Sequence, residues 1–199
     1  ERYFNMSENM ELTDGISEAI IKTVIKHSKI LKEHPDCYES RAEVMWASSL
    51  SHNDLTGCGT DGGDWACHQL EHEIGGMFDV AHGAGLAAVW GSWARYVYKA
   101  RPERFAKFAR NIFNIQETDD EKAAVAGIEA MENYYQSVGM PTSLCELGIH
   151  ATEEQIKEMA DKCSFYGKRT VGVMKKIGAP EAAEIYRMAN DKSIPLYSR

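Results

Sequence analysis

The sequence has no long apolar run, no excess of positive charge and no pair of cysteines at C-x-x-C spacing. No stretch approaches the ~18 uninterrupted apolar residues of a membrane-spanning helix, and the first residues do not form the basic and apolar pattern of a signal peptide. A net charge of −8 leaves no general cationic surface for phosphates, so neither nucleic acid nor an anionic membrane is expected as a partner. These absences predict a soluble, acidic protein.

The five cysteines are odd in number and scattered, without a C-x-x-C pair. This pattern argues against a disulfide framework and against a cysteine-built zinc site. It favours a reducing compartment, and we expect the cytoplasm. The chain also lacks an initiator Met and opens on "ERYF", so we expect it to be a piece of a longer protein.

Alternating apolar and polar segments, the pattern of β-strands, are also missing. Apolar residues recur instead at three- and four-residue steps, the period of an α-helix. With 199 residues, of which 44% are hydrophobic, the chain can bury one substantial core. We therefore predict an all-α helical bundle, a single domain at residues 1–190 and a loose tail at 191–199.

Caps and breakers mark the expected helices. Pro102 and Pro180 suit the first turns of two helices, and Thr152, followed by two acidic residues, is a strong start signal. A helix that starts near Trp65 is expected to weaken at Gly75 and Gly76. The other predicted helices lie at residues 12–31, 37–55, 82–100, 102–115, 119–139, 152–167 and 180–190.

Three of the seven histidines fall within fifteen residues. His68 and His72 are one helical turn apart, so both imidazoles leave the same face. His82 lies fourteen residues beyond His68, about 20 Å along an unbroken helix, which is too far for one ion. The helix must therefore break, and we expect Gly75, Gly76 and Asp79 to supply that break. Apolar surroundings favour neutral imidazoles, the form that binds metal.

Other interpretations of this cluster remain open. Single histidines in helical proteins are often only buried or capping groups, which would make the chain a non-catalytic binding domain. The letters "HQLEH" also match H-x-x-E-H, the inverted zinc-protease pattern, with His68 and His72 as ligands and Glu71 as general base. Glu146 would then be the third ligand. Against the protease, an all-α chain offers no sheet edge for an extended peptide.

Long stretches of the chain resemble the iron-containing alcohol dehydrogenases, in particular their NADPH-linked butanol dehydrogenase and aldehyde reductase branch. The resemblance covers about residues 1–190 and includes the histidine cluster. It rests on "RAEVMWASSLSHNDLTGCG", "DWACHQLEHEIGGMFDVAHGAGLAAVW", "PERFAKFARNIFNI", "GIEAMENYYQSVGMPTSLCELGI" and "EAAEIYRMAN".

The resemblance implies a metal-dependent enzyme that transfers hydride between NAD(P)H and a small alcohol or aldehyde. The family has an amino-terminal α/β cofactor domain and a carboxy-terminal helical domain, and the chain resembles the second. His68 and His82 match two ligands of the family's Fe²⁺ or Zn²⁺. The other two, an Asp and a His four residues apart, would lie just before Glu1, so this chain would hold half a site and be inactive alone. His72 matches a histidine beside the substrate and is the catalytic candidate.

Weaker candidates surround the cluster. Trp65 and Trp90 would wall a substrate pocket or belong to the core, while Glu71 and Glu73 would orient an imidazole or face solvent. The residues that bind the nicotinamide are expected mostly in the cofactor domain. Without that domain, apolar surface would be exposed, and we expect a homo-oligomer such as a dimer. We interpret the remaining histidines as structural or surface residues: His27, His34, His52 and His150.

Overall fold

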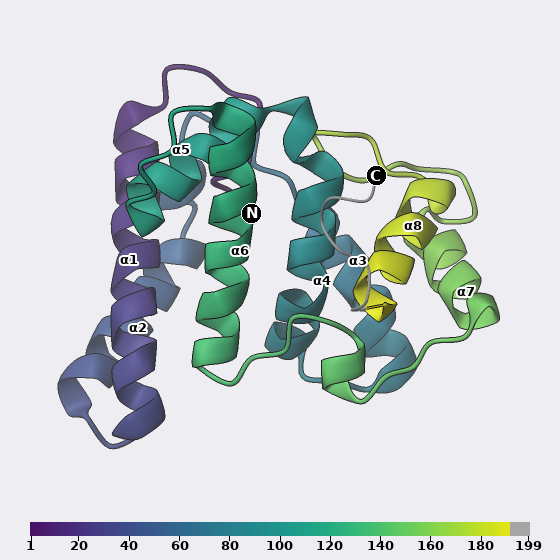
Figure 1. The fold of residues 1–199 in the computed structure, drawn as a ribbon, viewed down its shortest axis with the longest axis horizontal. Coiled ribbons are helices and arrows are strands. Elements are labelled where there is room, and N and C mark those ends of the chain that lie inside the picture. The colour runs from purple at the N-terminus through teal and green to yellow at the C-terminus, as the bar shows by residue number, and fades with distance from the viewer. Residues whose placement is uncertain (192–199) are drawn as a thin grey trace. The chain divides into compact units, whose positions relative to one another are not determined.

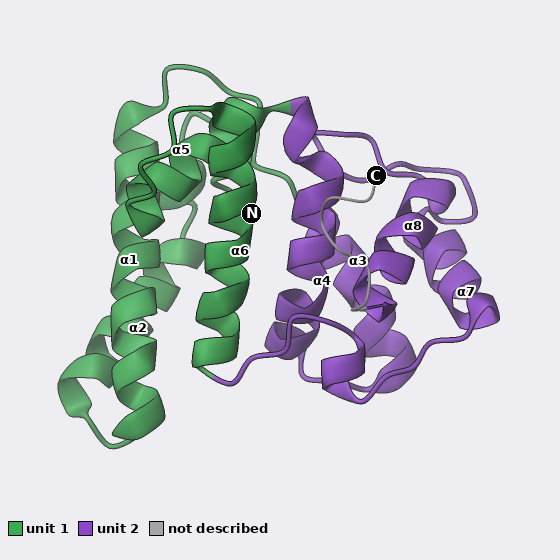
Figure 2. Cartoon of the chain, in the orientation of Figure 1, with its two compact units in different colours: residues 1–64, 101–138 green, residues 65–100, 139–199 purple. Residues whose placement is uncertain are grey.

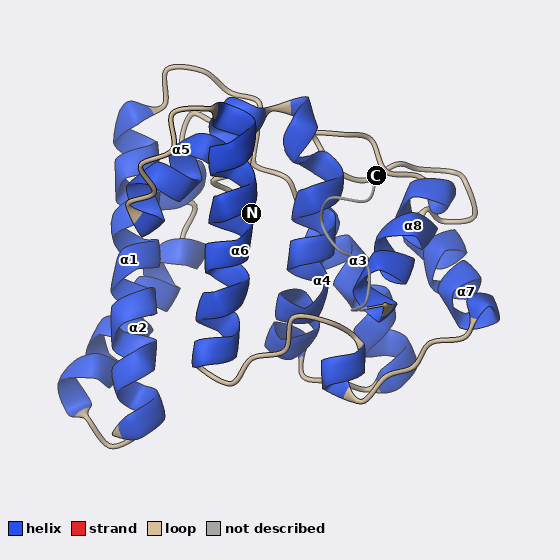
Figure 3. Ribbon diagram, viewed as in Figure 1, coloured by secondary structure: helices blue, strands red, loops and turns tan. Residues whose placement is uncertain are grey.

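In the computed structural model, which describes residues 1–191, the chain forms α-helices joined by loops and short 3-10 turns (Figures 1 and 3). The predicted all-α fold class is confirmed. The only β-type pairing in this described range is an isolated antiparallel bridge between Val171 and Ile177. The helices are α1 (Glu11–Glu33), α2 (Tyr38–His52), α3 (Ala66–Phe78), α4 (His82–Val97), α5 (Pro102–Phe113), α6 (Asp120–Ser137), α7 (Glu153–Cys163) and α8 (Ala179–Asn190).

Several helix ends follow the predicted chemistry. Pro102 is the first residue of α5, and Pro180 lies in the first turn of α8, where a missing N–H costs nothing. Thr152 forms a capping box with Gln155 at the start of α7, which satisfies two backbone donors that the helix itself leaves unpaired.

Several helix boundaries differ from the predicted ranges by one to four residues, and the ends of α3 and α7 show why. Helix α3 continues through Gly75 and Gly76 to Phe78 and ends where Asp79 takes a left-handed conformation with φ of 52°. Helix α7 ends at Cys163, four residues early, because Phe165 and Tyr166 also have positive φ. The glycine pair alone is therefore insufficient to end a helix whose other residues are packed.

The described chain divides into two compact units (Figure 2). Unit 1 comprises residues 1–64 and 101–138, and unit 2 comprises residues 65–100 and 139 onward. The predicted single domain at 1–190 stays a prediction, and residues 192–199 of the predicted tail lie outside the described residues. No described helix has the length and apolar character needed to cross a membrane.

Unit 1 contains α1, α2, α5 and α6. The apolar face of α5 is buried through Phe105, Phe108 and Ile112. Helix α6 approaches α5 closely at Gly127, where an added Cβ would lie 2.6 Å from the Cβ of Ala109. The small residues let the two backbones pack without a gap.

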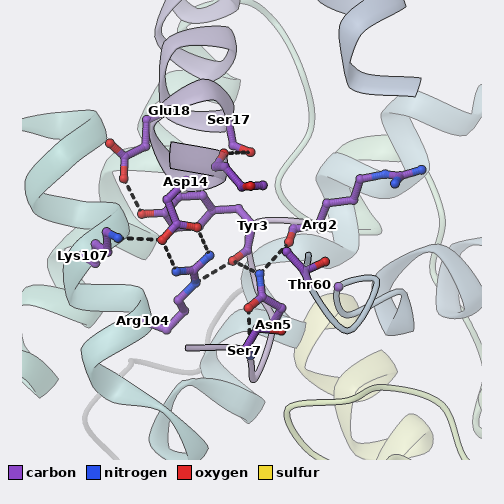
Figure 4. A network of polar contacts seen from close by, with 12 residues as sticks. Arg2, Tyr3, Asn5, Ser7, Asp14, Ser17, Glu18, Thr60, Arg104 and Lys107 are labelled. Carbon is purple, nitrogen blue, oxygen red and sulfur yellow. Dashed lines mark hydrogen bonds and ion pairs between the residues drawn. The ribbon is translucent and has the colours of Figure 1, made fainter. Parts of the chain in front are cut away.

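A buried polar network ties the start of the chain to α1 and α5 within unit 1 (Figure 4). Arg104 donates to both carboxylate oxygens of Asp14, at 2.5 and 2.6 Å, and Lys107 adds a third bond at 2.6 Å. Arg104 also donates from Nε to the Tyr3 carbonyl, and the Tyr3 hydroxyl donates to Glu18 at 2.8 Å. The charges of Asp14, Arg104 and Lys107 are paired with one another, and the Glu18 carboxylate accepts hydrogen bonds from Tyr3 and Asn111, as buried charged groups require.

Unit 2 contains α3, α4, α7 and α8. Leu70 and Ile74 of α3 and Trp93 of α4 are fully buried. The buried hydroxyl of Tyr186 on α8 donates to the Leu70 carbonyl at 2.7 Å, and burial raises its pKa well above the ordinary tyrosine value. The hydroxyl therefore remains a donor and fixes α3, which carries two of the clustered histidines.

Candidate metal centre

A chain reversal between α3 and α4 brings the three histidines together. His68 and His72 lie on α3, Asp79 ends that helix, and His82 is the first residue of α4. The ring centroids of His68 and His82 are 5.2 Å apart, those of His72 and His82 are 5.7 Å apart, and those of His68 and His72 are 6.3 Å apart. The predicted return of the chain occurs. Of the three residues expected to supply the break, Asp79 does so, whereas Gly75 and Gly76 stay helical.

Glu71 lies beneath this cluster and is almost fully buried, with 1% of its surface exposed. Its Oε2 forms a hydrogen bond with Nδ1 of His82. Its other oxygen, Oε1, is buried without a hydrogen-bond partner. A buried carboxylate that uses only one oxygen is costly, so its presence calls for an explanation beyond packing.

Two glycines make room for this carboxylate. A Cβ on Gly85 of α4 would lie 2.5 Å from Oε1 of Glu71, and one on Gly75 would lie 3.1 Å from the same atom. Gly85 therefore makes room for a side chain of the neighbouring helix, and no sequence pattern indicated this use.

The open side of the cluster faces solvent. His72 is exposed, His68 is half-buried, and 52% of the His82 side chain is accessible. Trp65, which is 39% exposed, places its ring edge-on to His68 with centroids 4.9 Å apart. A small ligand can therefore reach the imidazoles from outside while Glu71 stays covered.

The two other candidates near the cluster differ. Trp90 is buried and packs on Trp93 with centroids 6.4 Å apart, which is a core position. Glu73 is half-buried. Burial raises the pKa of its carboxyl above the ordinary value, although Lys162, Arg169 and His72 act in the opposite direction.

The donor set fits a divalent transition metal. Glu71, His72 and His82 each offer a ligand atom, and these atoms lie within 4.8 Å of one another. Imidazole nitrogens with a carboxylate suit Fe²⁺ or Zn²⁺. Because Oε2 of Glu71 is bonded to His82, the carboxylate is placed to orient that ring, an arrangement that metal-binding histidines commonly show.

The same geometry disfavours the zinc-protease interpretation. There Glu71 would activate water as a general base, but the structure buries its carboxylate beneath the imidazoles. Glu146, the proposed third ligand, accepts hydrogen bonds from the backbone N–H and the hydroxyl of Thr142 through Oε2. The Glu146 carboxylate therefore stabilises the turn at residues 142–146.

The remaining histidines have local roles or face solvent. His27 contacts Ser40 at 3.0 Å between α1 and α2, and His52 lies at the exposed end of α2. His34 and His150 are exposed. Their interpretation as structural or surface residues agrees with these positions.

Comparison with known proteins extends the argument to the whole chain. Residues 1–189 match the profile of the Fe-containing alcohol dehydrogenase family, C-terminal. The NADH-dependent butanol dehydrogenase A of Clostridium acetobutylicum is 35% identical over 94% of this chain and 48% of its own length. The NADPH-dependent aldehyde reductase of Escherichia coli is 30% identical over 95% of this chain and 48% of its own.

A solved structure shows the same fold. The NADH-dependent butanol dehydrogenase A from Thermotoga maritima superposes with a TM-score of 0.88 at 35% identity, covering 95% of this chain and 48% of that one. The chain spans about half the length of the curated relatives it matches. The chain therefore belongs to the iron-containing alcohol dehydrogenase family and corresponds to its C-terminal helical domain.

Proposed function

We propose that the whole protein is a metal-dependent alcohol dehydrogenase or aldehyde reductase, which transfers hydride between NAD(P)H and a small alcohol or aldehyde. The names of its relatives support this reaction class and include both NADH- and NADPH-dependent enzymes. The observation that carries the proposal is the convergence of His68, His72 and His82 above a buried carboxylate.

His68 and His82 are the ligands that this chain contributes to Fe²⁺ or Zn²⁺. Two imidazoles would supply half of the coordination, and the family resemblance implies that an Asp and a His outside this sequence would supply the rest. The bound metal would serve as a Lewis acid toward the substrate oxygen. Glu71 keeps His82 in one orientation beneath it, and Trp65 shields one edge of His68.

His72 positions the substrate or relays its proton. Its ring is exposed and lies beside that of His82, so it can hydrogen-bond a hydroxyl that approaches from solvent. His72 also belongs to the compact group of ligand atoms with Glu71 and His82, which makes it the alternative ligand in place of His68. Substitution separates these roles, because a ligand holds metal whereas a proton relay does not.

The test uses the full gene product, with metal content measured by elemental analysis and NADH- or NADPH-dependent reduction of butyraldehyde measured as activity. His68→Ala and His82→Ala are expected to lose metal and activity together. His72→Ala is expected to retain metal and lose turnover. His52→Ala, at the exposed end of α2, is the matched control. Full metal and activity in His82→Ala would overturn the proposal.

The 199-residue chain alone is expected to show no aldehyde reduction, because we place the nicotinamide site mostly outside it. Its setting is proposed to be the cytoplasm, where the five free thiols stay reduced. Adding NADPH and butyraldehyde to the purified chain tests the first statement. Turnover by the chain alone would contradict it.

The chain is also proposed to form a homo-oligomer, with a dimer as the simplest case. Tyr38, Met45 and Trp46 of α2 are 78%, 71% and 63% exposed, and their spacing places them on one helical face. Such a patch favours association. Light scattering of the wild type and of Trp46→Glu tests this; a monomeric mass for the wild type at every concentration would contradict it.

A further inference from the structure

We propose that Glu71 is a positioning residue: it accepts a hydrogen bond from the Nδ1–H of His82 and thereby leaves Nε2 as the unprotonated nitrogen for a metal ion. The inference rests on the proposed function, since it assigns His82 a metal. The primary test nevertheless needs no metal. A neutral imidazole carries one proton, and the partner of one nitrogen determines which nitrogen holds it.

The first argument is the contact itself. Nδ1 of His82 and Oε2 of Glu71 are hydrogen-bonded. With a carboxylate oxygen as the acceptor, this contact selects the Nδ1–H tautomer of the neutral ring. Glu71 comes from the middle of α3 and His82 from the first turn of α4, so the bond also fixes the imidazole relative to both helices.

The second argument is the accommodation of the carboxylate. Glu71 is 1% exposed, and Gly85 stands where any side chain would collide with its Oε1, Cγ and Cδ. A carboxylate that served only packing would be replaced without loss by an apolar side chain of similar volume. A buried acid that uses one oxygen, bonded to an exposed imidazole, has the position expected of a carboxylate that orients a metal-binding histidine.

The primary experiment is a ¹H–¹⁵N spectrum of the histidine rings in the metal-free 199-residue chain. It is recorded at about pH 8.5, some two units above the ordinary histidine pKa of ~6.5. We expect the Nδ1–H tautomer for His82 in the wild type. Glu71→Gln retains an acceptor oxygen and is expected to keep that tautomer, whereas Glu71→Leu is expected to shift the ring toward Nε2–H.

A second variant displaces the carboxylate without removing it. Gly85→Ala forces the flexible Glu71 side chain aside and is expected to shift the His82 tautomer as Glu71→Leu does. Gly83→Ala is the matched control, because its added Cβ meets nothing within 4 Å. Circular dichroism verifies that each variant keeps its helices.

Binding of Zn²⁺ by the full gene product supplies the metal readout. Loss of an orienting partner is expected to weaken affinity by about 10–100-fold in Glu71→Leu, with recovery in Glu71→Gln. An Nε2–H tautomer in the wild type, or an unchanged tautomer in Glu71→Leu, would overturn the inference. A tautomer that responds as expected in a protein that binds no Zn²⁺ would support the positioning role and count against the metal proposal alone.

Discussion

Two buried carboxylates, Asp14 in unit 1 and Glu71 in unit 2, differ in how many of their oxygens are hydrogen-bonded. Asp14 is 3% exposed and uses both oxygens, which accept three charge-assisted hydrogen bonds from Arg104 and Lys107. Glu71 is 1% exposed and uses one oxygen, which is bonded to the exposed ring of His82. Burial is similar, but only one of the two acids is fully paired.

We interpret the difference as one between a structural acid, Asp14, and an acid that we propose positions a histidine, Glu71. A fully paired buried acid holds its surroundings in one arrangement, because removing a partner leaves an uncompensated charge. A half-paired buried acid carries a desolvation cost that one hydrogen bond does not fully offset, so its position calls for an explanation other than stability.

The same contrast appears at two glycines. Gly127 of unit 1 leaves room for the methyl group of Ala109 between α5 and α6. Gly85 of unit 2 leaves room for the Glu71 carboxylate. The first close approach joins two helices through apolar contact. The second buries a polar group next to the histidines. Substitutions at Asp14 and Gly127 test how much these contacts of unit 1 stabilise the fold. Substitutions at Glu71 and Gly85 test whether their contact in unit 2 serves the histidine site instead.

The largest effect is expected from Asp14→Ala. The change leaves the Arg104 guanidinium, which is 5% exposed, without its carboxylate partner. It should reduce the free energy of unfolding by about 3–5 kcal/mol. Urea titration measures this loss. Glu43→Ala, which removes an exposed carboxylate from α2, should stay within about 0.5 kcal/mol of the wild type. Equal losses of unfolding free energy in Asp14→Ala and Glu43→Ala would show that the ion pairs of Asp14 do not stabilise the fold.

Acid should remove a large part of the same stabilisation. Burial by itself would raise the pKa of the Asp14 carboxyl, but hydrogen bonds and charge from Arg104 and Lys107 offset it, and the pKa is lowered below the ordinary value. Its contribution is therefore complete above the unfolded pKa of about 3.9 and is lost as pH falls through the folded pKa. The gap in unfolding free energy between wild type and Asp14→Ala should narrow below about pH 4. A gap independent of pH would refute this account.

A smaller loss is expected from Gly127→Ala. The new methyl group would lie 3.0 Å from the Ala109 Cα as well as 2.6 Å from its Cβ, so backbone must move, at about 1–3 kcal/mol. Gly15→Ala is the matched control within α1, where an added Cβ meets nothing within 4 Å. The control should stabilise the chain by about 0.5–1 kcal/mol. Thermal or urea unfolding of both variants decides whether the close approach matters.

Local signals predicted most of the fold. Helix period and end signals such as Thr152 and Pro102 act within one or two turns, so they can be interpreted without tertiary information. The spacing of His68, His72 and His82 predicted a chain reversal, which the structure shows. Asp79 ended α3 in place of Gly75 and Gly76 because a left-handed residue stops a helix, whereas packed glycines do not.

Pairings between distant residues were not predictable. Asp14 and Arg104 are 90 positions apart, and nothing in either segment specifies the other. Glu71 and Glu73 were equivalent candidates in the sequence, and only the packing of α3 against α4 buries the first beneath His82. The close fit of Gly85 to Glu71 likewise depends on two helices at once. Resemblance to a family supplied what local periodicity could not, namely the proposal that His68 and His82 are ligands.

The smallest change in stability is expected at Glu71, the carboxylate that we propose positions His82. Glu71→Leu replaces a half-paired buried acid with an apolar side chain of similar volume, which is often neutral or stabilising. Its unfolding free energy should therefore lie within about 1 kcal/mol of the wild type, or above it. Urea titration beside Asp14→Ala provides the comparison. A loss of unfolding free energy as large as that of Asp14→Ala would show that Glu71 is a structural acid. A carboxylate that only positions His82 should contribute little to the free energy of unfolding.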